Sequence, residues 1–273
     1  MKGNYTGTKT LSYKINPIDI STCTAKLSTT SYTYNSKART PGVTVMNAGG
    51  TTLTKDTHYT VSYASGRINA GTYKVTVTMK GNYKGTKTLS FKINPIDISK
   101  LTLSLNKTKY IYDGAVKKPY PTVKTANGAT LTNGTHFTYA YATNRKSVGA
   151  HTVTVTMKGN YTGTKTLSYT IVPASTTIYS LTAGTKSIGV KINNKVKSIS
   201  GYEVTYSTAK DFSGRKTITA TVTTAELEKA TKTVKLSELT TGKPYYVKVR
   251  TYKTVNGVNY YSGWSACKYV KAK

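Results

Sequence analysis

A thirteen-residue stretch occurs three times in this 273-residue chain, at a constant spacing of 78 residues. It begins at Met1 as MKGNYTGTKTLSY, at Met79 as MKGNYKGTKTLSF and at Met157 as MKGNYTGTKTLSY. Between these copies, residues 17–94 and 95–172 align without a gap. A fixed period of this length predicts a modular chain rather than one large domain. We therefore expect near-identical modules in tandem.

The repeated stretch and the residues before it have the pattern of paired β-strands. In Thr72–Met79, apolar and polar residues alternate strictly, and Thr86–Ile93 alternates again after the turn-forming segment Gly81–Gly85. Period-two alternation is typical of strands with one buried face. The chain also holds 24 Tyr against 3 Phe and 1 Trp, and tyrosine favours pleated, half-buried surfaces. Short strands separated by Gly and Asn predict an all-β fold of tandem β-sandwiches.

The repeat boundaries divide the chain into four segments. Residues 1–16 correspond to the closing hairpin strand of a truncated repeat, and 17–94 and 95–173 are complete repeats. Residues 174–273 differ in character and form a separate domain. An unpaired strand exposes free backbone groups, so we expect residues 1–16 to be frayed, or to pair at an edge with another chain. Otherwise we expect a monomer.

The repeats resemble a known class of bacterial domain. The pattern Tyr-x-Tyr followed by Asn-Ser or Asp-Gly, then a Thr-Leu-Thr segment and a Gly-Asn-Tyr-Thr-Gly-Thr hairpin, is similar to the immunoglobulin-like tandem repeats of surface proteins from Gram-positive gut bacteria. This resemblance implies a secreted or wall-attached multidomain protein. Its signal and anchor are then expected outside this chain.

The C-terminal segment resembles a fibronectin type III domain. The resemblance places strand B at Ile188–Ile192, strand C at Tyr202–Ser207 and the start of strand G at Tyr261–Ser265. It implies that the hydroxyl of Tyr245 bonds back to the backbone in a tyrosine corner. One departure is Ile192, which stands where that family usually has a tryptophan.

The residues required for catalysis or metal binding do not form a recognisable pattern. The histidines are His58, His136 and His151, and the first two are equivalent positions of two repeats. No zinc-binding or phosphate-loop motif is present, and the two cysteines, Cys23 and Cys267, fit free thiols better than a disulfide framework. We therefore expect no enzyme, no metal and no cofactor. No apolar run approaches the length of a membrane span.

The net charge of +31 is spread along the whole chain. Dispersed charge favours solubility and loose attraction to polyanions, whereas a nucleic-acid binder usually concentrates its charge on one face. The sequence thus favours a non-catalytic spacer or adhesion segment of a bacterial cell-surface or secreted protein. One alternative is a glycan- or polyanion-binding accessory module of a wall-associated enzyme, with teichoic acid or mucin as the ligand. The other is a charge-driven nucleic-acid binder.

The candidate ligand contacts are the tyrosines at the three hairpin tips, Tyr5, Tyr83 and Tyr161. Exposed tyrosine rings can stack on sugars, so these residues would contact anionic or mucin-type glycans or a cell-wall polymer. The competing hypothesis is that each ring folds back over its own turn.

Overall fold

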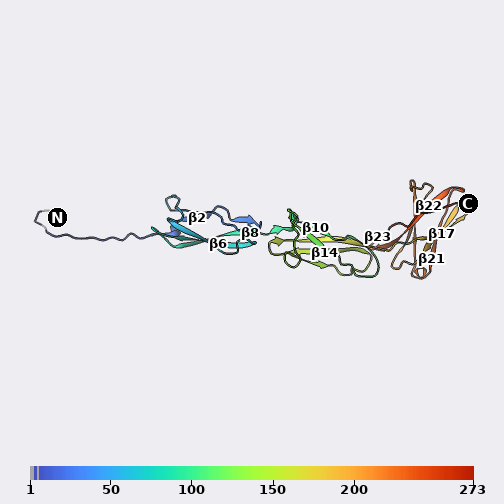
Figure 1. Cartoon of the computed structure of the whole chain (residues 1–273), viewed down its shortest axis with the longest axis horizontal. Helices are drawn as coiled ribbons and strands as arrows, with labels where there is room; N and C mark the ends of the chain where they lie inside the picture. The colour runs from blue at the N-terminus through green and yellow to red at the C-terminus, as the bar shows by residue number, and fades with distance from the viewer. Residues whose placement is uncertain (1–2, 5) are drawn as a thin grey trace. The chain divides into compact units, whose positions relative to one another are not determined.

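The computed structural model describes residues 3–4 and 6–273, and its strands confirm the predicted all-β class (Figure 1). The chain divides into two compact units. One holds residues 1–100 together with 134–137 and 157–163, and the other holds residues 101–133, 138–156 and 164–273. Tyr5, at the first hairpin tip, lies outside the described residues.

The first repeat contains one four-stranded sheet and two two-stranded sheets. Its strands are β1 (Ile18–Asp19), β2 (Thr24–Leu27), β3 (Ser31–Thr33), β4 (Val43–Met46), β5 (Tyr59–Tyr63), β6 (Gly71–Met79), β7 (Tyr83–Lys84) and β8 (Thr86–Asn94). Strands β2 and β4 form an antiparallel pair, and a four-stranded sheet has the order β3-β8-β6-β5. Within that sheet β3 runs parallel to β8, while β6 is antiparallel to both β5 and β8.

The alternation in the sequence accounts for the core of this repeat. Val75 and Val77 of β6 and Phe91 and Ile93 of β8 are buried on the inner face, whereas Thr72 on the opposite face is exposed. Fully burying one such apolar side chain stabilises a fold by about 1.5–3 kcal/mol. The two strand predictions are therefore confirmed, and their apolar faces hold the sheet in place.

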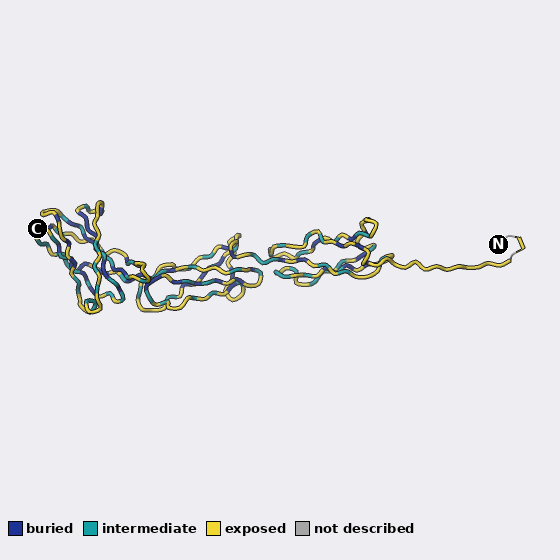
Figure 2. The backbone as a smooth tube through the Cα atoms, turned by 180° about the vertical axis from the view of Figure 1, so that it is seen from behind, coloured by how far each residue is buried: buried dark blue, intermediate teal, exposed yellow. Residues whose placement is uncertain are grey.

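Residues 6–16 form no strand and are exposed throughout (Figure 2). Leu11, Tyr13 and Ile15 are 80%, 88% and 80% exposed. Their equivalents in β8 are buried or half-buried because they pack into the core of the first repeat, whereas residues 6–16 pair with none of the described strands. Residues 6–16 therefore have the same sequence pattern as β8 but lack the burial that would hold them in a strand.

The second repeat has the same order of elements. Its strands are β9 (Ile96–Asp97), β10 (Thr102–Leu105), β11 (Lys109–Ile111), β12 (Pro121–Lys124), β13 (Phe137–Tyr141), β14 (Gly149–Met157), β15 (Tyr161–Thr162) and β16 (Thr164–Val172). The four-stranded sheet has the order β11-β16-β14-β13, and β10 pairs with β12. A 3-10 turn follows the first strand of each repeat, at Ile20–Thr22 and Ile98–Lys100.

The C-terminal domain has two sheets around a separate core. Its strands are β17 (Ile178–Gly184), β18 (Ser187–Asn193), β19 (Gly201–Ser207), β20 (Lys216–Thr221), β21 (Thr231–Leu236), β22 (Pro244–Val255), β23 (Val258–Tyr261) and β24 (Lys268–Lys271). One sheet has the order β17-β18-β21, and the other has the order β20-β19-β22-β23, with β24 also paired to β22. A single turn of helix, α1 (Thr224–Leu227), carries a capping box between Thr223 and Glu226.

The predicted strands B and C of this domain are confirmed as β18 and β19. Ile188, Val190 and Ile192 of β18 are fully buried, so isoleucine fills the position that the resemblance assigns to tryptophan. The hydroxyl of Tyr245 accepts a hydrogen bond of 2.9 Å from the Thr240 N–H, which is the expected tyrosine corner.

Candidate functional site

Two features of the described chain bring polar and aromatic side chains together. The first is the hairpin tip that follows β14, where Asn160 and Tyr161 lie. The second is the outer face of β19 and β22 in the C-terminal domain.

Each described tip tyrosine packs edge-on against the histidine of its own repeat. The ring centroids of Tyr83 and His58 are 5.7 Å apart, and those of Tyr161 and His136 are also 5.7 Å apart. The His58 ring is fixed because its Nδ1 accepts a hydrogen bond of 2.9 Å from the Thr54 N–H. This edge-on contact is the arrangement that aromatic pairs prefer.

The two tips differ in burial, although their sequences are nearly the same. Tyr83 is half-buried, while Tyr161 is only 8% exposed. The difference arises because the Tyr34 ring lies 6.0 Å from the Tyr161 ring, at an interplanar angle of 74°. Burial also raises the pKa of Tyr161 above its ordinary value. A sugar could stack on this ring only after it left Tyr34, so the glycan hypothesis stays a prediction and Tyr83 is its more accessible candidate.

Asn160, beside Tyr161, makes side-chain contacts that the sequence did not reveal. Its Oδ1 accepts a hydrogen bond of 2.7 Å from the Ala70 N–H, and its Nδ2 donates one of 3.0 Å to Asn69 Oδ1. We call Tyr34, Asn69, Ala70, Asn160 and Tyr161 the joint; all five belong to one compact unit. The sequence did contain one signal of these contacts. The two repeats differ at this point, because Asn69 and Ala70 correspond to Ser147 and Val148 in the second repeat.

The first strand of the second repeat, β9, is fixed to the same tip, as β1 is to the tip of the first repeat. Ile96 donates its N–H to the Asn160 carbonyl at 2.9 Å, and β9 runs parallel to β15. Gly163 closes the turn with φ +101°, and a Cβ there would lie 2.7 Å from Ile98 Cγ2. Glycine is therefore required both for its left-handed backbone and for the close approach of Ile98.

On the second feature, Arg250 lies between two aromatic rings and a carboxylate. Its guanidinium carbon is 3.9 Å from the Tyr261 ring centroid and 4.3 Å from that of Trp264. The register of β19 and β22 places Glu203 directly opposite Arg250, and the two form an ion pair. Cation–π contact and charge pairing both fix the planar guanidinium.

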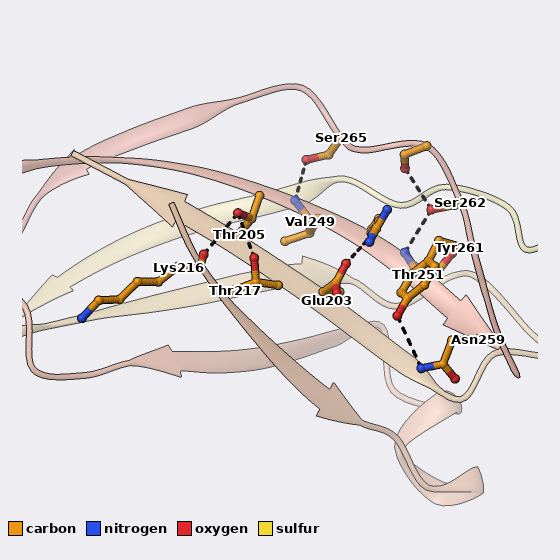
Figure 3. Close-up of polar contacts among 12 residues, drawn as sticks. Glu203, Thr205, Lys216, Thr217, Val249, Thr251, Asn259, Tyr261, Ser262 and Ser265 are labelled. Atoms are coloured by element: carbon orange, nitrogen blue, oxygen red, sulfur yellow. Dashed lines mark hydrogen bonds and ion pairs between the residues drawn. The ribbon is translucent and has the colours of Figure 1, made fainter. Parts of the chain in front are cut away.

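Two serine hydroxyls flank Trp264 in the sequence and bond to β22. Ser262 Oγ accepts from the Thr251 N–H and Ser265 Oγ from the Val249 N–H, each at 3.0 Å (Figure 3). The two serines also donate their own N–H groups to the carbonyls of the same two residues, at 3.0 and 2.8 Å. The prediction that strand G starts at Tyr261–Ser265 is therefore wrong: β23 ends at Tyr261 and β24 begins at Lys268. Between β23 and β24, the hydroxyls of Ser262 and Ser265 accept the β22 N–H groups that the backbone carbonyls of a regular strand would accept.

A hollow of about 480 Å³ lies over this face of the sheet. Its lining consists of charged, aromatic and threonine side chains, namely Glu203, Thr205, Phe212, Arg215, Thr217, Lys248, Arg250 and Trp264. The Lys248 Nζ is 4.3 Å from the centroid of the Phe212 ring. Sequence reasoning missed this site because its residues come from four separate segments.

Metal-binding and thiol chemistry receive no support from the described residues. Across residues 3–4 and 6–273, no group of three or more His, Cys, Asp or Glu residues could hold a metal ion. His151 Nε2 lies 2.9 Å from the Ser147 carbonyl oxygen. Both cysteines are free, as predicted, with Cys23 buried and Cys267 exposed.

None of the helices in the described part of the chain has the length and apolarity to cross a membrane.

Comparison with known proteins gives only distant similarities. No model of a protein family matches the sequence, and no curated protein does. Among solved structures, the FN1–FN3 domains of chicken CNTN1 are 12% identical, with a TM-score of 0.31, and the match covers 94% of this chain and 99% of that one. The chicken interferon gamma receptor alpha chain is 10% identical, with a TM-score of 0.29, over 75% of this chain and 97% of that one. At these scores the likenesses carry no argument about function.

Proposed function

We propose that this chain is a non-catalytic spacer and adhesion segment of a bacterial cell-surface or secreted multidomain protein. The repeated module, the four-segment division at residues 16, 94 and 173, and the resemblance of the repeats to bacterial surface domains motivate the proposal. The observation that carries it is the joint, because a spacer needs connections between modules that resist bending.

The joint supports this role through two kinds of contact between the repeats. Asn160 hydrogen-bonds to the Ala70 N–H and to the Asn69 side chain, and the Tyr161 ring packs on Tyr34. A linker that made no such contacts would behave as a flexible chain. Both contacts join the tip of the second repeat to the first repeat.

The test is the distance distribution between two spin labels, measured by pulsed electron resonance. The labels replace the exposed Lys26 and Lys158, which belong to the same compact unit, with Cys267 changed to serine so that it is not labelled. We expect one narrow distribution. Tyr34→Ala removes the ring that covers Tyr161, so it should broaden the distribution.

The matched control is Tyr112→Ala, because Tyr112 is the equivalent of Tyr34 in the second repeat. Like Tyr34, Tyr112 packs against the core of its own repeat, but no tip tyrosine is described against it. The distribution should stay narrow in this variant. A broad distribution in the unsubstituted chain would refute the spacer proposal, as would equal broadening by the two variants.

A further inference from the structure

The hollow on the outer face of β19 and β22 contains two cations whose charge is not neutralised. Glu203, the carboxylate in its lining, is paired with Arg250. Among the described residues, neither Lys248 nor Arg215 forms an ion pair. The half-buried Lys248 lies over the Phe212 ring, and Arg215 is exposed at the margin. The hollow thus has an excess of positive charge and can take an anion.

The wall and floor of the hollow are suited to a sugar ring. Trp264 remains 37% exposed, although Arg250 lies over one face of its ring and Ser262 and Ser265 fix its position on either side. On the floor, Thr217 donates its hydroxyl to Thr205 Oγ1 at 3.3 Å, which leaves its oxygen able to accept from a ligand hydroxyl. An aromatic wall with a few convergent polar groups is the usual composition of a small-molecule site.

The loop that carries Phe212 is fixed as firmly as Trp264. Phe212 has φ +62°, a conformation that a bulky residue adopts only when its surroundings enforce it. Ser207 Oγ donates to the Ser213 carbonyl at 2.6 Å, and Asp211 accepts from the Ser213 N–H at 2.9 Å. Both sides of the hollow are therefore formed before any ligand arrives, which lowers the entropic cost of binding.

We propose that this hollow binds one carboxylate-bearing sugar residue, such as a uronic acid. Its carboxylate would lie between Lys248 and Arg215, and an apolar face of its ring would lie against Trp264. A carboxylated sugar fits better than an acidic peptide because the aromatic wall and the threonine floor match a ring with hydroxyl groups. The assignment goes beyond the spacer role and does not depend on the joint.

The test uses the full chain and the fluorescence of Trp264, its only tryptophan. Methyl glucuronide is titrated at about 150 mM NaCl, where attraction between exposed charges is screened beyond about 8 Å. Methyl glucoside serves as the neutral counterpart, and acetate as the bare carboxylate. We expect a saturable change with the glucuronide alone. An equal response to the glucoside or to acetate would overturn the proposal.

Two variants locate the site. Lys248→Met keeps an apolar stem over Phe212 and removes the charge, so it should weaken glucuronide binding by at least about tenfold. Lys191→Met is the matched control, because Lys191 also lies over an aromatic ring, 5.1 Å from the Tyr179 centroid, on the other sheet. The control should bind like the unsubstituted chain. Equal weakening by both variants would mean general polyanion attraction and would overturn the assignment.

Arg215→Gln keeps the proposal falsifiable if Lys248→Met fails to fold. Arg215 is exposed, so its substitution leaves the core intact and should still weaken glucuronide binding several-fold. Unchanged glucuronide binding in a folded Arg215→Gln variant would show that the carboxylate does not lie in this hollow.

Discussion

The joint gives a quantitative prediction for the Asn160→Ala variant. The substitution removes the acceptor of the Ala70 N–H and the donor to Asn69 Oδ1. A buried donor left without a partner costs about 1–3 kcal/mol. Asn160 and Ala70 are both half-buried, so water can replace part of the lost bond and the lower end of this range applies. We expect the contact to weaken by about 1 kcal/mol, which is roughly a fivefold change in its equilibrium constant.

Hydrogen exchange measured residue by residue should show this loss. In Asn160→Ala, the Ala70 amide should exchange about fivefold faster, while amides in the centre of β6 and β8 keep their rates. The matched control is Asn82→Ala, since Asn82 occupies the same position of the first tip but its side chain is exposed. Surface substitutions of this kind change stability by less than about 0.5 kcal/mol. An unchanged exchange rate of the Ala70 amide in Asn160→Ala would refute the hydrogen bond between Asn160 and Ala70.

Three further predictions concern stability. Gly163→Ala should destabilise the protein more than Gly159→Ala, measured by urea unfolding; both positions have positive φ, but only at Gly163 would the new methyl group meet a neighbour, at 2.7 Å. Equal losses would contradict the role of that close approach. Burial raises the pKa of Tyr202 to about 12, so the unfolded chain releases this proton first and stability should fall as pH rises from about 10 to about 12. In Tyr202→Phe, stability should fall less steeply over this pH range. At neutral pH the same variant should be less stable by about 1–3 kcal/mol, because Asn194 loses its hydrogen bond. An equally steep fall with pH in this variant would show that Tyr202 is not the group responsible. Deletion of residues 1–16, exposed where described, should leave the thermal unfolding of the remaining chain nearly unchanged, and a large loss would show an undetected contact.

Local patterns in the sequence predicted much of the fold. The alternation in Thr72–Met79 and Thr86–Ile93 was sufficient because the period of two assigns the apolar residues to one face of each strand, whichever residues that face then packs against. The bond of the Tyr245 hydroxyl was implied by the resemblance to a fibronectin type III domain, and it joins a backbone group only five residues away. The expectation that the chain lacks cofactors stays a prediction.

The candidate sites depended on contacts that local patterns do not contain. Asn160 and Ala70 are 90 residues apart, and nothing in the repeat itself indicates that the two tips have different surroundings. The C-terminal hollow was missed for a related reason. The similarity to a strand suggested continuous pairing through Ser262–Ser265, whereas the serine hydroxyls complete that pairing and place Trp264 beside Arg250.

The residues of the joint also restrict how such a chain can change during evolution. Tandem repeats that align without a gap invite unequal recombination in the gene, which duplicates or deletes whole modules. The two repeats are nevertheless not interchangeable, because Asn69 and Ala70 of the first correspond to Ser147 and Val148 of the second. A duplicated first repeat would recreate the side-chain contact between Asn69 and Asn160, whereas a duplicated second repeat would place serine opposite the incoming asparagine. We therefore expect expansion of the array to proceed by copying the first kind of module, with the second kind retained at its C-terminal end.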